Sequence, residues 1–469
     1  MPTQQEYNVV KQPSRDIRAI FSIYDSSFND VGNIEGVVLG APSFTNNSTS
    51  DIRRTCSVSL HPIDSSFDLV RGSKLWLDKY VKIELGIWDI QNQEYVYTNM
   101  GYYIMDNPSQ SYSAVDNTLT FSGSDLMAKL TGLRGGNLEG MDYEIPAGTN
   151  VRQLLIDTIA LFGFTDYDID EFPIDTPNKI EISAGGNAYN IIKEILDLLP
   201  NWQAYFDVDR VFHFHQIPNG TNETVLVDDD IWKNVLISYN RAYDEDNIKN
   251  YIEVLGKEHE DTMACGEVTI VSDIYTCTSS DAASLVDMLI FTFTTPSTIL
   301  SDPKININSW GAKNIRNQDG TVPTLVADTY YAIEYVQNGD YFKFLSSTQP
   351  YAVAYENNPD SPFYINSEIG TLRIVLSGGE YDNINSDYLA QERAKFELYQ
   401  RCRLLDSVTI TCVPIYWLDT NWLIEITLPN ANSVEETNQY LIKSINTTFG
   451  TSGTQSISLM RYYPYYPST

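Results

Sequence analysis

Apolar and polar residues alternate with a period of two over long parts of this 469-residue sequence. Residues 17–24 and 81–88 show the pattern clearly, with β-branched and aromatic side chains at alternate positions. Such alternation is typical of strands that bury one face and expose the other. A polar stretch at 89–93 separates the second run from the strand-like residues 95–97, as the loop of a hairpin does. The first part of the chain is therefore predicted to form an antiparallel barrel or sandwich.

The character of the sequence changes near residue 145. Thr149 or Asn150 can accept hydrogen bonds from the free amides of a first helical turn, and an apolar stripe follows as far as Phe162. A second helix is predicted from Asn187 to the residue before Pro200, because the proline ring cannot continue a helix. These helices and the β-hairpin after them predict a small α+β domain between β-rich segments.

Strand patterns return after residue 220, and one further helix is predicted to begin at Ser386 or Asp387. Residues 260–360 carry a strand pattern of their own and have the size of a domain inserted at a loop tip. The sequence thus predicts a mainly β protein with two β-barrel domains, a small α+β domain and an inserted β-sandwich domain. The predicted boundaries are 1–140 for the first barrel, 141–220 for the α+β domain, 221–262 and 362–469 for the second barrel with its helix, and 263–361 for the inserted β-rich appendage.

The net charge restricts the classes of partner. Acidic residues number 62 and basic residues 30, which gives a formal net charge of −32. A chain this acidic has no broad cationic face to collect phosphates, so sequence-specific nucleic-acid binding is not expected.

The sequence shows neither a targeting signal nor closely spaced cysteine pairs. Residues 1–15 lack the apolar core of a signal peptide, and the longest apolar stretch, at 285–293, is interrupted by Asp287, so no membrane-spanning segment is predicted. The five cysteines are widely spaced and none belongs to a C-x-x-C pair. A reducing compartment fits this usage best, and the cysteines indicate no zinc site.

Several segments of the chain resemble the baseplate or tail-tip hub proteins of long-tailed bacteriophages and related contractile injection systems. These segments are 50–54, 101–106, 119–126, 145–149, 378–384, 387–404, 414–419 and the final run from 440–445 up to 461–464. The resemblance implies a structural protein of the virion tail tip, assembled in the cytoplasm of the bacterial host. It also implies a homotrimer in which each chain gives two tube-like barrels, so that six barrels match a hexameric tail tube.

The same resemblance implies the partners. They are further copies of the chain, the tail tube or distal tail protein, the central spike or tip protein, the tape measure protein, and baseplate wedge or receptor-binding proteins. The trimer would form part of the channel that conducts DNA, where its acidic side chains would repel phosphates. No cofactor and no catalytic residue are predicted. Two other functions stay open: a tail-associated cell-wall hydrolase, and a receptor- or saccharide-binding tail protein that uses the inserted domain.

The inserted segment resembles a small β domain found in phage tail fibres and other appendages, on segments such as 305–315 and 330–335. This likeness implies a peripheral decoration that contacts a saccharide or a partner. Four aromatic residues are candidates for that contact because they could offer stacking faces: Trp310, Tyr331, Tyr335 and Tyr341. Aromatic residues in short strands also serve as core or cross-strand packing, which is the alternative for all four.

Two histidines and two acidic runs are candidate metal ligands. His213 and His215 are expected to share one face of a strand, a spacing that can chelate zinc, but the pattern places no third ligand and no metal site is predicted. The sequence from Asp166 to Pro177 begins like a calcium loop, yet Glu171 stands where the loop needs glycine. Residues 228–230 are expected to cap a helical segment, with a cation site as the alternative.

Overall fold

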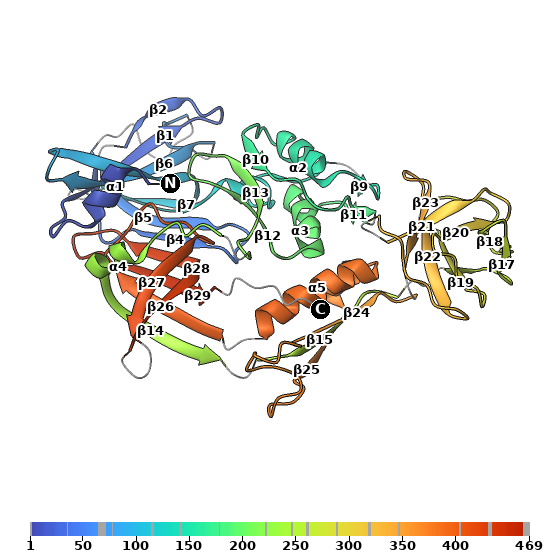
Figure 1. The fold of residues 1–469 in the computed structure, drawn as a ribbon. Helices are drawn as coiled ribbons and strands as arrows, with labels where there is room; N and C mark the ends of the chain where they lie inside the picture. The colour runs from blue at the N-terminus through green and yellow to red at the C-terminus, as the bar shows by residue number, and fades with distance from the viewer. Residues whose placement is uncertain are drawn as a thin grey trace.

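The computed structural model describes residues 2–462, apart from 35, 64–71, 77, 114–116, 140–142, 178, 221–222, 245–246, 259–261, 288, 318–319, 346–347, 403–404 and 430–433. The fold is mainly β, which confirms the predicted fold class (Figure 1). Residues 403–404 and 463–464, which belong to segments that resemble tail-tip hub proteins, lie outside the described part.

A 13-stranded sheet forms the larger end of the molecule. Its N-terminal half contains β1 (Ile17–Tyr24), β2 (Asp30–Asn33), β3 (Gly36–Val38), β4 (Ser43–Asn47), β5 (Arg54–Pro62), β6 (Tyr80–Asp89), β7 (Glu94–Tyr112) and β8 (Asn117–Ser124). Its C-terminal half contains β14 (Leu236–Asp244), β26 (Leu405–Cys412), β27 (Leu423–Pro429), β28 (Glu435–Thr448) and β29 (Gln455–Arg461). The main path runs β14-β26-β29-β28-β4-β5-β8-β7-β6-β1-β2, with β3 on β5 and β27 on β28.

One strand pair joins the two halves. β28 pairs antiparallel with β4, from Ser444 opposite Asn47 to Thr448 opposite Ser43. The two β-rich regions therefore stand side by side in one sheet, although hundreds of residues separate them in the sequence (Figure 1). A single apolar core spans the join and includes Phe21 and Val58 from the first half and Ile410 from the second.

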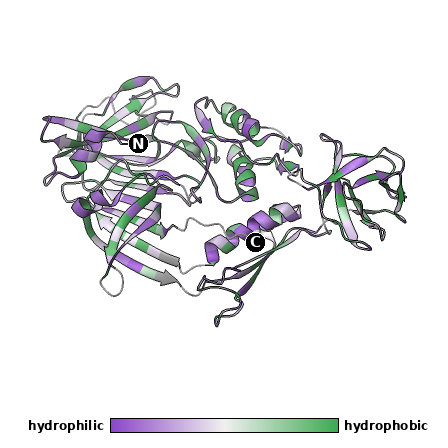
Figure 2. Cartoon of the chain, viewed as in Figure 1, coloured by the Kyte–Doolittle hydropathy of each residue, from purple (hydrophilic) through white to green (hydrophobic). Residues whose placement is uncertain are grey.

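The period-two pattern explains this core. Along β5 the residues alternate between buried and less buried positions, and in β27 Leu423, Ile424, Ile426 and Leu428 are buried. Figure 2 shows the resulting mixture of hydrophobic and hydrophilic residues along the strands of the sheet. Burial of such side chains contributes roughly 1.5–3 kcal/mol each, which fixes the register because a one-residue slip would expose them.

The small α+β module follows β8. It contains the short 3-10 helix η2 (Leu126–Lys129), α2 (Val151–Ala160), α3 (Ala188–Leu198), a three-stranded sheet β10-β13-β12 and the pair β11-β9. The strands are β9 (Tyr143–Ile145), β10 (Tyr167–Ile169), β11 (Ile180–Ile182), β12 (Trp202–Phe206) and β13 (Phe212–Gln216). Of the two caps considered for α2, Asn150 is the one that accepts the amide of Gln153, and Asn187 caps α3 by accepting the amide of Asn190.

The third of the predicted helices belongs to a layer outside the large sheet. α5 (Asp387–Arg401), capped by Ser386, packs on a separate three-stranded sheet of β15 (Tyr251–Leu255), β24 (Tyr351–Tyr355) and β25 (Arg373–Leu376). This layer shares one apolar core with α2 and α3 of the α+β module. The sequence analysis above places α5 in the second barrel region, whereas its buried Leu389, Ala390 and Ala394 belong to the same apolar cluster as residues of α2 and α3.

The appendage is an eight-stranded sheet with its own core, at the end of the molecule away from the large sheet (Figure 1). Its strands are β16 (Thr262–Ala264), β17 (Thr269–Val271), β18 (Ile274–Cys277), β19 (Ile290–Thr294), β20 (Lys304–Ile307), β21 (Lys313–Arg316), β22 (Tyr330–Val336) and β23 (Tyr341–Phe344). β24 lies inside the range predicted for the appendage, 263–361, but it pairs with β15, and its pairing runs from Leu255 opposite Tyr351 to Tyr251 opposite Tyr355.

Two short α-helices and the 3-10 helix η3 (Gly379–Asn383) complete the described fold. α1 (Gln4–Val10), which is not among the predicted helices, begins with a capping box between Thr3 and Glu6 and buries Val9 and Val10 in the large core. α4 (Asp229–Val235) is capped by Asp228, in line with the capping role expected for this acidic run. Among the described residues, the helices are too short or too polar to cross a lipid bilayer.

A half-buried carboxylate on α3 gives the fold a pH dependence. Burial raises the pKa of Asp197 to about 6, and Glu194 and Glu380 add to the effect. An unfolded aspartate has a pKa of about 4, so the folded state holds this proton more tightly and stability falls as the pH rises from about 4 to about 6. We expect Asp197→Asn to remove this loss and to stabilise the protein at pH 7 by about 1 kcal/mol, discounted for partial exposure.

Urea unfolding between pH 4 and pH 8 measures this effect. The difference between the variant and the natural protein should grow through the pH 4–6 range and then stay constant. Asp157→Asn, on the exposed side of α2, controls for the loss of one carboxylate. A difference that stays flat over the whole pH range would contradict the assignment to Asp197.

Candidate functional site

Arg54 lies where three parts of the fold meet. It is on β5 and is buried, with its side chain 6% exposed. Its Nη2 donates to Asp419 of the C-terminal half at 2.5 Å, and its Nη1 donates to the carbonyl of Phe206 in the α+β module. Its backbone amide donates to the Asp125 carboxylate at 2.8 Å. One side chain therefore links both halves of the large sheet and the module.

Electrostatics at Arg54 favour the ion pair. Burial alone would lower the pKa of Arg54, but the carboxylates of Asp419 and Asp125 outweigh it, and this pKa lies above its ordinary value. Asp419 also accepts Asn46 Nδ2 and the backbone amide of Thr420, both at 2.7 Å. A buried charge with a complete set of partners holds a unique geometry, whereas losing one partner is costly.

A second arginine joins the same three parts. The Arg53 guanidinium lies 4.2 Å from the centroid of the Tyr205 ring and donates from Nη2 to Gln203 Oε1 at 2.9 Å. Gln203 Oε1 also accepts Asn421 Nδ2 at 2.8 Å, which ties β12 to the C-terminal half. Cation–π and hydrogen-bond contacts therefore fix the α+β module against the large sheet.

A cavity of about 440 Å³ lies at this junction. Its lining comes from α1, both halves of the sheet and the α+β module, and includes Glu6, Arg54, Asp419, Tyr205 and His213. The cavity is thus an interdomain space with mixed charge. Its lining also connects the junction to a cluster of histidines and aspartates on the module.

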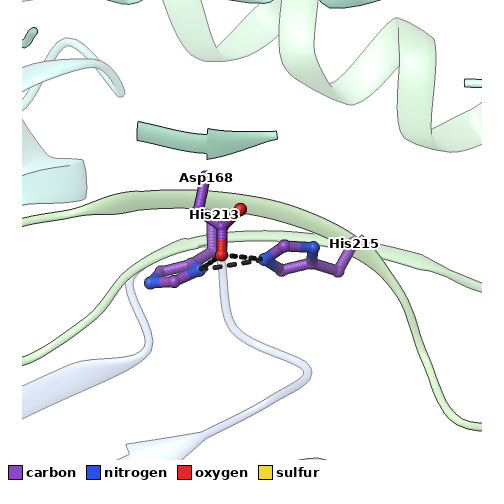
Figure 3. A group of neighbouring side chains, drawn as sticks. All are labelled: Asp168, His213 and His215. Atoms are coloured by element: carbon purple, nitrogen blue, oxygen red, sulfur yellow. Dashed lines mark hydrogen bonds and ion pairs between the residues drawn. The ribbon is translucent and has the colours of Figure 1, made fainter. Parts of the chain in front are cut away.

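The histidine–aspartate cluster lies on one face of the sheet β10-β13-β12 (Figure 3). β10 pairs parallel with β13, and Asp168 lies opposite His213 in this register. Asp168 Oδ2 lies 3.6 Å from His213 Nδ1 and 3.4 Å from His215 Nε2, and the two ring nitrogens are 2.9 Å apart. The opposite face carries Phe212 and Phe214, which are fully buried.

The outer ring nitrogens of both histidines also have carboxylate partners. His213 Nε2 lies 3.0 Å from Asp207 Oδ2, and His215 Nδ1 lies 2.9 Å from Asp170 Oδ2. Burial would raise the pKa of Asp207, but hydrogen bonds from His213 and from the amides of Val211 and Asp209 outweigh it and lower this pKa. Asp207 is therefore an ionised, fixed acceptor for His213.

The spacing of His213 and His215 predicts a shared strand face, but the sequence pattern places no third ligand beside them. In the sequence, Asp168 stands out only as part of a calcium-loop-like run with Asp166 and Asp170. Its position depends on the parallel pairing of β10 with β13, which local patterns do not reveal. The signal that was available is the alternation at 166–170, where aspartates flank Tyr167 and Ile169 as on one face of a short strand.

The four aromatic residues proposed for a saccharide or partner contact do not form one surface. Tyr331 and Tyr335 are each 7% exposed and belong to the appendage core, and the Tyr335 hydroxyl donates to Asp340 at 2.8 Å. Trp310 is partly buried and packs edge-on against Phe291. Tyr341 lines a separate cavity of about 330 Å³ between the appendage and residues 147–177 of the α+β module.

Comparisons with known proteins address the fold. The family model that matches is described as a domain of unknown function (DUF5048) and covers residues 360–466, less than a quarter of the chain. No curated protein matches the sequence.

Solved structures match over nearly the whole chain at low sequence identity. The 43 kDa tail protein of prophage MuSo2 from Shewanella oneidensis is 9% identical, with 94% of this chain and 98% of that chain covered and a TM-score of 0.50. The tail protein from Neisseria meningitidis MC58 is also 9% identical, with 94% and 96% covered and a TM-score of 0.48. The likeness to the MuSo2 protein shows a shared fold, so the predicted resemblance to phage tail proteins is confirmed at the level of fold.

Proposed function

We propose that this chain is a structural hub at the distal tip of a phage-type tail. In this role it forms a homotrimer that adapts a six-fold tail tube to a three-fold central spike and lines part of the DNA channel. The β4–β28 pairing carries the proposal, because it sets two β-rich halves side by side in one sheet. Three chains would then supply six such halves, which matches the symmetry of the tube.

The fold shared with a prophage tail protein supports a place in a tail. The buried junction around Arg54 supports a structural role, because it holds the two halves and the module in one fixed arrangement. The net charge of −32 supports a channel wall that repels phosphates. The partners follow from this role: the tail tube or distal tail protein, the spike, the tape measure protein and baseplate wedge proteins. No catalytic activity is proposed.

The end of the large sheet offers a surface for assembly. β14 pairs with β26 on one side and with no strand on the other within the described part of the chain. It exposes Ile237 by 58% and Tyr239 by 39%. An unpaired edge with exposed apolar side chains is a ready site for another chain, and obligate assemblies bury such edges.

Mass measurement tests the trimer. Light scattering is expected to give about 159 kDa, three times the 53.1 kDa of one chain. Ile237→Lys should shift the mass toward one chain at equal concentration, because a charge would be buried at the edge of β14. Val271→Lys, at a position 55% exposed in the appendage, should leave the mass unchanged. A particle of one chain at every concentration would contradict the proposal.

A further inference from the structure

Three side-chain atoms of the histidine–aspartate cluster converge on one point. The distances between His213 Nδ1, His215 Nε2 and Asp168 Oδ2 are 2.9, 3.4 and 3.6 Å. Metal–nitrogen and metal–oxygen bonds to zinc are about 2.0–2.2 Å, so two ligand atoms of a tetrahedral site lie about 3.3 Å apart. The three observed distances bracket this value. Figure 3 shows the three side chains pointing toward one another.

The carboxylates of Asp207 and Asp170 determine which ring nitrogens can bind a metal ion. His213 Nε2 faces the Asp207 carboxylate and His215 Nδ1 faces the Asp170 carboxylate, so these outer nitrogens donate. In a neutral imidazole the other nitrogen then carries a lone pair. The two inner nitrogens lie 2.9 Å apart, within hydrogen-bond distance, and two lone pairs this close repel unless a proton or a metal ion lies between them. Carboxylates behind ligating histidines are the usual second layer of a metal site.

The cluster is exposed to solvent on the side of Asp168. Asp168 has a side chain 64% exposed, while His213 and His215 are 17% and 22% exposed. The histidines are therefore held by packing, with His213 stacked on Tyr205 at 5.1 Å, and the Asp168 carboxylate lies on the solvent side. Three protein ligands with an open fourth position for water is an arrangement that zinc accepts.

We propose that Asp168, His213 and His215 bind one divalent transition-metal ion per chain, with zinc as the best-matched ion. Two imidazoles and one carboxylate disfavour magnesium and calcium, which prefer all-oxygen ligand sets. The ion joins β10 to β13, two strands whose pairing extends over only three residues. Metal binding therefore fastens the segment around β10 to the rest of the α+β module. This assignment stands independently of the tail role.

Titration calorimetry with ZnCl2 on the tag-free, chelator-treated full-length protein tests the proposal. One ion per chain is expected to bind. Asp168→Asn and His215→Ala should each weaken binding by more than about 100-fold, and Asp170→Asn, behind His215, by about 10–100-fold. MgCl2 should give no heat at the same concentrations. Bound Co2+ should give the visible absorption of a tetrahedral nitrogen and oxygen site.

Matched variants separate the site from unspecific binding. His61→Ala removes a histidine on β5, and Asp166→Asn removes an exposed aspartate next to β10, so both should keep the wild-type affinity. Asp168 is exposed, so its variant should fold, and circular dichroism checks this. Absence of saturable Zn2+ and Co2+ binding to the natural protein would overturn the proposal. Unchanged affinity in Asp168→Asn or His215→Ala would overturn it as well.

Discussion

Asp419→Asn is expected to lower the free energy of unfolding by about 3 kcal/mol. The substitution keeps the shape of the side chain but removes the negative charge that pairs with Arg54 at 2.5 Å. Arg54 would then be a buried cation with a neutral partner, and removing one member of a buried pair typically costs about 3–5 kcal/mol. Because Arg54 also contacts Phe206, the α+β module should loosen from the large sheet.

Thermal unfolding and hydrogen exchange measure this loss. Exchange should accelerate in β5 and in β12, the strands that carry Arg54 and Phe206. Asp302→Asn is the control, since Asp302 pairs with Arg316 at 2.8 Å but is 54% exposed, and such pairs are worth under about 1 kcal/mol. Equal, small effects of the two substitutions would mean that the junction does not depend on the buried pair.

Lys343→Met is expected to destabilise the appendage by about 3–5 kcal/mol. Lys343 Nζ lies 2.9 Å from Glu334, and the two side chains are 2% and 5% exposed. They are cross-strand neighbours on β23 and β22. Methionine fills similar volume but leaves the Glu334 carboxylate buried without its cation. Adding Glu334→Leu should recover most of the loss, because two apolar side chains can replace a buried ion pair.

Hydrogen exchange over residues 262–345 reads out this effect. The appendage has a core separate from that of the large sheet, so its protection should fall while that of β5 and β28 stays the same. Lys313→Met is the matched control, because Lys313 pairs with the exposed Asp340 at 2.7 Å in the same sheet. If the double variant Lys343→Met/Glu334→Leu were as unstable as Lys343→Met alone, the loss of stability would not come from the unpaired Glu334 carboxylate.

The strands and helices of this chain are well encoded by local sequence. Alternation predicted some strands of the large sheet, such as β1 and β6, and side chains that accept backbone amides predicted where α2, α3 and α5 begin. These signals are local because a strand needs only one buried face and a helix needs only a cap and an apolar stripe. α1 escaped notice because only Val9 and Val10 among its residues reach the core.

Pairings between distant segments could not be predicted in the same way. The contact of β28 with β4 joins residues 444–448 to residues 43–47, and no local pattern specifies a partner at that distance. The same holds for β24, which alternation assigns to the appendage but which pairs with β15. Asp168 reaches His213 and His215 only through such a pairing, so the cluster needed the fold to become visible.

The way in which the appendage is attached has a practical consequence. β15 and β24 are antiparallel neighbours, so the chain leaves the body near Leu255 and returns near Tyr351, directly opposite. An insert whose ends lie next to each other places little strain on its host, and exchanging it need not disturb the remaining layers. This position could carry a foreign module, such as a fluorescent reporter or a different recognition domain, on an otherwise unaltered scaffold.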